Sequence, residues 1–207
     1  LSNSGTISVE TAFTATNYLR PTDSTSDVVD IKEGATLSIT NDATISTLNV
    51  ESPTNDFATI STNGNLTISS ATYNSADIQT SGTIKLPDTT EDNKIGSLKI
   101  ESGELTIEKL HVNSLNVVEG TIDISTVNLS RELTNETSGS VDIDELNILN
   151  SSTLSGALTI GTLKAENLGG KTLKINGSIS VGTLSLSGTK TADSEENKYL
   201  KIDGAGS

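Results

Sequence analysis

The chain has 207 residues, carries 27 Asp and Glu against 13 Lys and Arg, and has a formal net charge of -14 at pH 7, with no Cys, Met or Trp. So acidic a chain repels phosphates, which argues against nucleic acid as a partner, and the lack of Cys excludes disulfides and Cys-bound metals. The longest apolar runs have two or three residues, far short of the roughly 20 that span a bilayer, so we expect no membrane insertion by this chain.

One short phrase recurs from the first residues onward and predicts the strands. It consists of a Gly, any residue, an aliphatic residue, a polar residue and a second aliphatic residue. This alternation has the two-residue period of a β-strand, with Leu, Ile and Val on one side and polar residues on the other. Each copy therefore predicts one short strand. Copies begin at Gly5, Gly64, Gly82, Gly96, Gly103, Gly120, Gly139, Gly156, Gly177 and Gly182, and a looser copy begins at Gly34.

Three stretches of the chain depart from this phrase. Residues 14–33 and 87–95 are polar and contain Pro and several charges, and residues 188–207 form a polar end. We expect the first two to be loops that bulge from the fold and the last to be a frayed end. No stretch is long enough to separate two folding units, so we expect a single solenoid domain over residues 1–207.

The spacing of the phrase predicts the architecture. Between Gly82 and Gly177 the copies that keep the rhythm lie 17 to 21 residues apart, and a weaker phrase of the type L-x-V or L-x-I falls between them, as at residues 145–148. Two or three strands and their turns fill about 19 residues, the content of one rung of a parallel β-helix. We predict an all-β fold, a right-handed parallel β-helix (β-solenoid) of about nine or ten rungs of roughly 19 residues. The variable spacing argues against the strict six-residue repeat of left-handed β-helices.

Tandem β-sandwich modules are the alternative fold, because they also consist of short alternating strands joined by turns. Only 2% of the residues are aromatic, whereas sandwich cores usually contain several large aromatic side chains. Asn-Gly turns of the hairpin type occur only at residues 63–64 and 176–177, and each opens a copy of the phrase. Both observations favour the solenoid.

His111 is the only histidine, so a Ser-His-Asp triad would have to use it. It lies at a polar position between Leu110 and Val112, which directs its side chain outward from a predicted strand. No Ser has the G-x-S-x-G pattern of a nucleophile elbow. We therefore expect no enzymatic activity, no catalytic residue and no cofactor.

Paired carboxylates are the remaining candidates for chemistry. Asp142 and Asp144 lie two residues apart on the polar side of one predicted strand, at about 6.5–7 Å by strand geometry. Carboxylates at such a separation cleave glycans in some enzymes, so a glycan-active β-helix enzyme is one alternative. Such enzymes usually add aromatic platforms and basic residues for the sugar acid, and this chain has only Arg20 and Arg131 as arginines. A solvated acidic face is the simpler interpretation.

The same carboxylates are weak candidates for a Ca²⁺ site, because Ca²⁺ takes oxygen ligands from acidic loops. Asp88, Glu91 and Asp92 crowd the predicted loop at 87–95, and Asp142 with Asp144 forms a second group. Neither stretch has the D-x-[DN]-x-[DN]-G pattern of a calcium loop. We therefore expect no specific metal site.

The repeated GTIxI, GNLTI and GSIxV phrases, interleaved with TLxL in an acidic chain rich in Ser, Thr, Asn and Gly, resemble a known group of proteins. They are similar to the passenger domains of bacterial autotransporters and to filamentous-haemagglutinin-like exoproteins, over roughly residues 34–190. The resemblance implies a secreted or cell-surface β-helix, a passenger or stalk segment of a larger exoprotein with a role in adhesion or virulence. Its implied partner is a host or surface receptor, either a glycan or a protein, or a second copy of itself. A structural subunit of a surface layer, sheath or fibre, assembled through its ends, is a further alternative.

Overall fold

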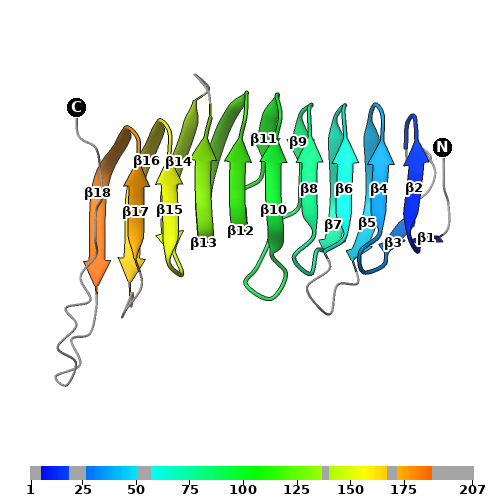
Figure 1. Cartoon of the computed structure of the whole chain (residues 1–207), viewed down its shortest axis with the longest axis horizontal. Coiled ribbons are helices and arrows are strands. Elements are labelled where there is room, and N and C mark those ends of the chain that lie inside the picture. Colours follow the sequence, from blue (N-terminus) through cyan, green and yellow to red (C-terminus); the bar gives the residue numbers. More distant parts are fainter. Residues whose placement is uncertain (1–5, 19–26, 51–56, 137–139, 167–171, 188–207) are drawn as a thin grey trace.

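The computed structural model of the chain describes residues 6–18, 27–50, 57–136, 140–166 and 172–187. These residues form an all-β solenoid, whose backbone winds in about eight turns stacked along one axis (Figure 1). The pairings between the described strands are parallel, from β1 with β3 to β16 with β18. The predicted parallel β-solenoid is therefore confirmed, and the antiparallel sandwich alternative is wrong. The right-handed sense of the coil stays a prediction.

The expected nine or ten rungs exceed the number of turns that the described residues form. The early coils are longer than the average rung that the phrase suggested. Phe13, Leu37 and Ile60 occupy equal positions on successive coils, at spacings of 24 and 23 residues. Later coils are shorter: Leu98, Leu115 and Leu133 are paired at spacings of 17 and 18 residues.

The strands are short in the first half of the chain and longer in the second. The first half contains β1 (Thr6–Val9), β2 (Ala12–Ala15), β3 (Val28–Ile31), β4 (Thr36–Ile39), β5 (Ala43–Val50), β6 (Thr59–Thr62), β7 (Leu66–Thr72), β8 (Asp77–Thr80) and β9 (Ile84–Lys85). The second half contains β10 (Ile95–Ile100), β11 (Glu104–Thr106), β12 (Lys109–Val117), β13 (Thr121–Asn135), β14 (Val141–Ile148), β15 (Ser152–Ser155), β16 (Leu158–Glu166), β17 (Leu173–Asn176) and β18 (Ile179–Ser187).

A complete coil has three extended runs, which we name face 1, face 2 and face 3 in chain order. In one coil of the second half, face 1 is residues 141–143, face 2 is residues 145–148 and face 3 is β15. The long strands β13, β14, β16 and β18 pass from face 1 to face 2 without a break in the strand assignment. Each face thus stacks equivalent positions of successive coils.

The core consists of the aliphatic residues that alternate inward on these faces. Along β14, Val141, Ile143, Leu146 and Ile148 are buried, and the polar residues between them are half-buried or exposed. The register stacks such residues into columns that run along the solenoid. One column on face 3 is at most 1% exposed over its middle seven coils and only partly buried at its two ends, Phe13 and Ile175. The seven residues are Leu37, Ile60, Ile78, Leu98, Leu115, Leu133 and Leu154. Burying each such side chain contributes about 1.5–3 kcal/mol, so this stack supplies the folding energy that a globular core would supply.

At the turn into face 1, the backbone conformation and the close approach of the preceding coil require a glycine. Gly103 has a φ of 95°, and a Cβ atom there would lie 2.6 Å from the carbonyl oxygen of Gly82 on the coil before. Other copies occupy different places: Gly34 precedes β4 on face 3, and Gly96 lies within β10. The phrase therefore predicts a strand correctly but does not predict which face the strand belongs to.

The loop expected at residues 14–33 is wrong at both of its ends. β2 extends to Ala15, and Tyr18 is 1% exposed and pairs with Ala43 in a parallel bridge. β3 then follows at Val28–Ile31, since Val29 and Ile31 alternate inward although their surroundings are polar. Residues 19–26 and the expected frayed end at 188–207 lie outside the described residues.

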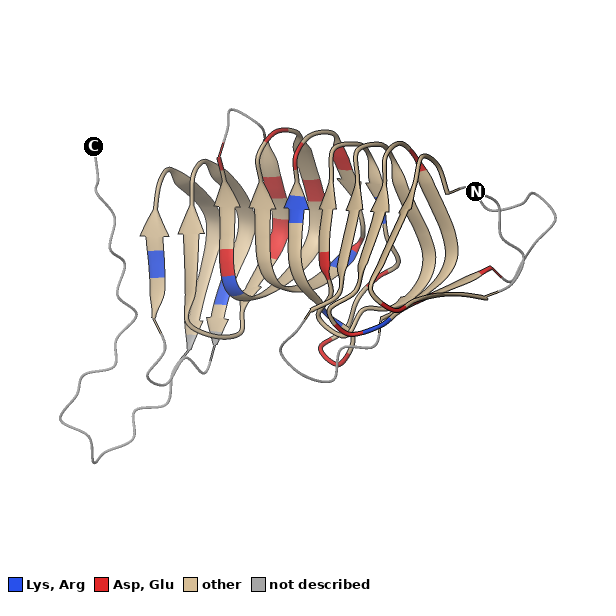
Figure 2. Cartoon of the chain, turned by 45° about the vertical axis from the view of Figure 1, so that its right-hand side comes forward, with Lys and Arg blue, Asp and Glu red and all other residues tan. Residues whose placement is uncertain are grey.

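Charged side chains lie on the outside of the coils. Figure 2 shows Asp and Glu on several coils, with fewer Lys and Arg among them. Asp27 is the exception, a fully buried carboxylate that accepts a hydrogen bond from the backbone nitrogen of Ser46 at 3.0 Å. The acidic excess is therefore mainly a property of the surface that solvent and partners meet.

Candidate functional site

One coil of the solenoid lacks the face 2 strand that its neighbours have. The coil before it has residues 70–72 of β7 on face 2, and the coil after it has residues 109–112 of β12. Between them residues 86–94 form no strand, and β10 begins at Ile95, which pairs with Val112. The loop predicted at 87–95 is thus correct to within one residue at each end. We name residues 86–94 the face 2 loop.

The side chain of Asn93 takes the place of the missing strand toward the coil before. Its Nδ2 donates to the carbonyl oxygen of Ala71 at 2.8 Å, and its Oδ1 accepts from the backbone nitrogen of Tyr73 at 2.6 Å. A residue in a parallel pair makes the same two contacts, as Tyr18 does when it bonds the carbonyl of Asp42 and the nitrogen of Thr44. The amide of Asn93 therefore imitates a peptide group placed opposite residue 72.

Thr89 replaces the missing strand in the same way on the other side, toward β12 of the following coil. Its backbone nitrogen donates to the carbonyl oxygen of Lys109 at 3.0 Å, and its Oγ1 accepts from the backbone nitrogen of His111 at 2.5 Å. The hydroxyl thus stands where a paired residue would offer its carbonyl, opposite Leu110. Thr89 is 1% exposed, so the loop reaches the core here although it is polar in composition, and Leu86 at the start of the loop is buried as well.

Asp88, one of the weak metal candidates, also bonds to the backbone of the following coil. Its Oδ1 accepts from the backbone nitrogens of Glu108 and Lys109 at 3.1 and 3.0 Å. A carboxylate that already accepts two backbone hydrogen bonds is held in place by the strand it caps. Asp88 therefore has a structural role, whereas Glu91 and Asp92 remain exposed on the outer part of the loop.

A hollow of about 180 Å³ lies between the face 2 loop and the coils that follow. We name it the His111 hollow. Side chains from the loop, from β12, from β13 and from the turn after β14 border it, and they include Glu91, Lys94, His111, Ser130, Leu149 and Asn150. The hollow exists because the loop replaces a flat strand at this point of face 2.

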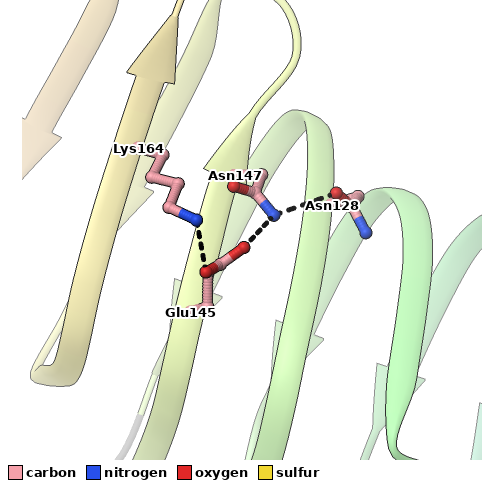
Figure 3. Close-up of polar contacts among 4 residues, drawn as sticks. All are labelled: Asn128, Glu145, Asn147 and Lys164. Atoms are coloured by element: carbon pink, nitrogen blue, oxygen red, sulfur yellow. Dashed lines mark hydrogen bonds and ion pairs between the residues drawn. The ribbon is translucent and has the colours of Figure 1, made fainter. Parts of the chain in front are cut away.

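A row of polar side chains crosses four consecutive coils next to the hollow, and we name it the face 2 ladder. Lys164 Nζ lies 2.5 Å from Glu145 Oε2, and Asn147 Nδ2 donates both to Glu145 Oε1 at 3.0 Å and to Asn128 Oδ1 at 3.1 Å (Figure 3). Asn128 Nδ2 in turn lies 3.1 Å from His111 Nε2. The parallel register produces this row, since it pairs His111 with Asn128, Asn128 with Asn147, and Asn147 with Lys164.

The ladder fixes the orientation of its own amides and the tautomer of His111. A carboxylate only accepts hydrogen bonds, so Asn147 must turn its NH₂ group toward Glu145 and gives the second hydrogen of that group to Asn128 Oδ1. Asn128 then has only its NH₂ group left to face His111, and Nε2 has to accept. A neutral imidazole that accepts at Nε2 carries its proton on Nδ1.

His111 and Glu145, at the two ends of this chain of hydrogen bonds, titrate in different environments. Desolvation lowers the pKa of His111, the positive charges of Lys109 and Lys94 lower it further, and Glu91 opposes them. A protonated ring would also place an N–H group against the NH₂ of Asn128. The pKa of Glu145 is lowered, chiefly by its hydrogen bond from Lys164 and then by Asn147. At neutral pH the ladder therefore has an ion pair at one end and an uncharged imidazole at the other.

The imidazole offers the hollow a largely apolar surface. Nε2 is occupied by Asn128, and Nδ1 is inaccessible to solvent, with no hydrogen-bond partner among the described residues. What remains accessible on the ring is mostly carbon. Leu149 adds a second apolar group, since it is 39% exposed at the border of the hollow. The His111 hollow thus combines an apolar part with the charged and polar groups of Glu91, Lys94, Ser130 and Asn150.

The second pair of carboxylate candidates lies away from this site. Asp142 lies on face 1 in register with Asp123, and it accepts a hydrogen bond from Ser140 Oγ at 2.5 Å. Asp144 is exposed where β14 bends from face 1 to face 2. The structure does not bring these residues to the loop candidates, and within the described part of the chain no three His, Asp or Glu side chains gather into a group that could hold a metal ion.

The face 2 ladder was missed at the level of sequence, although a signal for it exists. His111, Asn128, Asn147 and Lys164 each occupy the middle position of the weaker phrase, an aliphatic residue on either side of a polar one. The phrase predicts strands, but only the register shows that these middle positions stack on one another. His111 itself was expected to point outward, and it does, into a hydrogen bond with the next coil.

None of the described segments is a helix of the length and apolarity needed to cross a membrane. Comparison of the chain with protein-family models, with curated proteins and with solved structures finds no match.

Proposed function

We propose that this chain is a non-enzymatic segment of a secreted or cell-surface protein that makes adhesive contacts through the side of its solenoid. The observation that carries the proposal is the face 2 ladder with its adjoining hollow, an outward row of polar groups held in fixed order over four coils. Such a row suits many modest contacts with an extended partner. The phrases that resemble autotransporter passengers and filamentous-haemagglutinin-like exoproteins support the extracellular location and the role as passenger or stalk.

The stacking of the coils supports a mechanical part of this role. Each coil inside the solenoid is hydrogen-bonded through its backbone to the coils before and after it, as β14 is to β13 and β16. A rod built in this way resists bending, and it holds a contact surface at a distance from its anchoring point. Stiffness and a repetitive side surface are the properties that a passenger or stalk needs.

The test is attachment of coated beads to cells or to a glycan-bearing surface under flow. We expect beads coated with the chain to attach, and the double variant Asn147→Ala, Lys164→Ala to lose attachment. The matched control is Gln79→Ala, Lys99→Ala, which removes one amide and one ammonium group from face 3 instead. Beads with the control variant should attach as the wild type does. Failure of the wild-type beads to attach, or equal loss by both variants, would contradict the proposal.

A structural subunit that assembles through its ends is the second candidate. Leu184 and Leu186 of β18 are in register with the buried Leu163 and Ala165, yet they are 49% and 46% exposed. An exposed strand with apolar side chains can pair with another chain. This candidate predicts that sedimentation shows concentration-dependent filaments while coated beads fail to attach.

A further inference from the structure

We propose that the His111 hollow binds one neutral sugar ring of an extended glycan. This inference rests on the contact function proposed above and names the class of partner. The hollow lies on the side of the solenoid beside the face 2 ladder, so a chain of sugars that enters it with one ring has the polar groups of the ladder next to its other rings.

The size of the hollow limits the ligand to a single ring. Its volume of about 180 Å³ is that of a small pocket. Pockets for drug-sized molecules are larger, about 300–1,000 Å³. A larger rigid ligand therefore does not fit, whereas one ring of a longer flexible polymer does.

The chemistry of the walls matches the two kinds of surface that a sugar ring has. The carbon atoms of His111 and the exposed side chain of Leu149 suit the C–H groups of a ring face. The rim of hydroxyls can donate to Glu91, accept from Lys94, and do both with Ser130 and Asn150. The groups around the hollow thus allow both donation and acceptance, as neighbouring hydroxyls require.

The charge of the chain selects a neutral glycan over an acidic one. Glu91 and Lys94 contribute opposite charges at the hollow, and His111 is neutral at pH 7 because its pKa is lowered. The chain as a whole carries a net charge of -14, which repels uronic and sialic acids on approach. A neutral hexose is the ring that meets no such repulsion.

The experiment is a titration of the full chain with neutral and acidic oligosaccharides, followed by calorimetry on any that bind. We expect neutral oligosaccharides to bind, and Leu149→Ala and Glu91→Gln each to lower the affinity about tenfold, or about 1.4 kcal/mol. The matched control is Phe57→Ala, which removes another exposed apolar side chain, 37% accessible, from an earlier coil. Its affinity should stay that of the wild type.

The outcomes separate this inference from the proposed function. If no neutral oligosaccharide binds but coated beads still attach, the sugar site is wrong and the contact function stands. If neutral oligosaccharides bind and the hollow variants weaken this binding while beads fail to attach, the sugar site stands and the contact function is wrong.

Three results would each overturn the sugar site: binding that Leu149→Ala and Glu91→Gln leave unchanged, binding of acidic glycans alone, or attachment through a protein ligand alone. Cleavage of the oligosaccharides that disappears in Asp142→Asn would overturn it as well, in favour of a glycan-active enzyme.

Discussion

The coil that carries the face 2 loop and the coils that follow it satisfy the backbone hydrogen bonds of face 2 in different ways. In the later coils, residues 126–129 and 145–148 pair backbone to backbone and place Val127 and Leu146 in the core. In the loop coil, the side chains of Thr89 and Asn93 supply the hydrogen bonds that a strand would supply. A solenoid thus tolerates a missing strand where the backbone groups of both neighbouring coils still find partners.

The two solutions differ in what they leave on the outside. A strand presents a flat row of side chains, such as the face 2 ladder. The loop rises from the coil and creates the border of the His111 hollow, which no strand would create. The irregular coil is therefore the place where this otherwise repetitive surface gains a hollow.

The largest expected effect concerns the aliphatic column of face 2. Leu146 is fully buried and lies between Val127 and Leu163 on the coils before and after it. We expect Leu146→Ala to lower the free energy of unfolding by about 2–5 kcal/mol, because a cavity remains between two ordered strands. Urea unfolding followed by circular dichroism measures it.

The same substitution at Leu110 probes the packing beneath the face 2 loop. Leu110 is also fully buried, but it lies between Thr89 of the face 2 loop and Val127. We expect Leu110→Ala to cost less than Leu146→Ala, since a loop can move into the space more easily than a paired strand. An equal or larger loss at Leu110 would show that the loop is as rigid as a strand.

Removal of the amide that replaces the strand should have the next largest effect. Asn93→Ala leaves the carbonyl of Ala71 and the nitrogen of Tyr73 without the partner they have now. We expect a total loss of about 1–3 kcal/mol, because both groups lose their partner at a partly buried position. Asn116→Ala is the control, because its amide bonds to the exposed carboxylate of Glu136. Equal stability of the two variants in urea unfolding would mean that Asn93 does not replace a strand.

Thr89 allows a finer test of the same idea. Thr89→Val keeps the shape of the side chain but removes the oxygen that accepts from the nitrogen of His111, so we expect a loss of about 1–3 kcal/mol. Thr89→Ser keeps that oxygen and should retain most of the stability. Hydrogen exchange of the His111 amide, followed by NMR, should accelerate in the Val variant only. Similar exchange in both variants would contradict the role of the hydroxyl.

The smallest expected effect is the pH dependence that His111 introduces. Its folded pKa is lowered below the ordinary value of 6.5, so between these two values the unfolded chain binds more protons than the folded one. The contribution of His111 to stability is therefore complete above about pH 6.5 and is lost as the pH falls through the lowered pKa. Because His111 is the only histidine, His111→Asn should remove this part of the pH profile, which thermal unfolding at several pH values measures.

The ladder adds a prediction about the titration of His111 itself. In Glu145→Gln the group at 145 can donate as well as accept, so Asn147 and Asn128 are free to reverse their amides. We expect the pKa of His111, followed by NMR of its ring, to rise toward its ordinary value. Glu101→Gln, which removes the matching carboxylate of the Lys99 pair on face 3, should leave it unchanged. A His111 pKa unaffected by Glu145→Gln would contradict the order of donors and acceptors described above.

Much of the fold follows from sequence patterns, and the details that create the site do not. Alternation and spacing predict the parallel solenoid, because inward aliphatic residues such as Leu98 and Leu115 keep a regular distance along the chain. The same alternation was overlooked at Val29 and Ile31, where the polar composition of residues 14–33 suggested a loop. Composition describes a whole stretch, whereas four residues suffice for a strand once the coil beside it offers a partner.

The site depends on contacts that the chain makes about one coil away from each residue. Asn93 bonds residues 20 and 22 positions earlier, and Asp88 bonds residues 20 and 21 positions later. Asp88, Glu91 and Asp92 are close neighbours in the chain, and for that reason the sequence predicts them together as weak metal candidates. In the folded chain Asp88 instead bonds to the backbone of Glu108 and Lys109, and Glu91 lies at the hollow. Their closeness in the sequence does not reveal these different positions.

The direction of the hydrogen bonds between coils has a consequence for how the molecule responds to force. Those bonds run along the axis of the solenoid, so tension applied between the two termini draws on one coil at a time rather than on all of them together. A coil of 17 to 21 residues, as between Leu98, Leu115, Leu133 and Leu154, then releases about 55–75 Å of chain at roughly 3.3–3.6 Å per residue. Under sustained tension the protein would lengthen one coil at a time while the remaining coils stay folded.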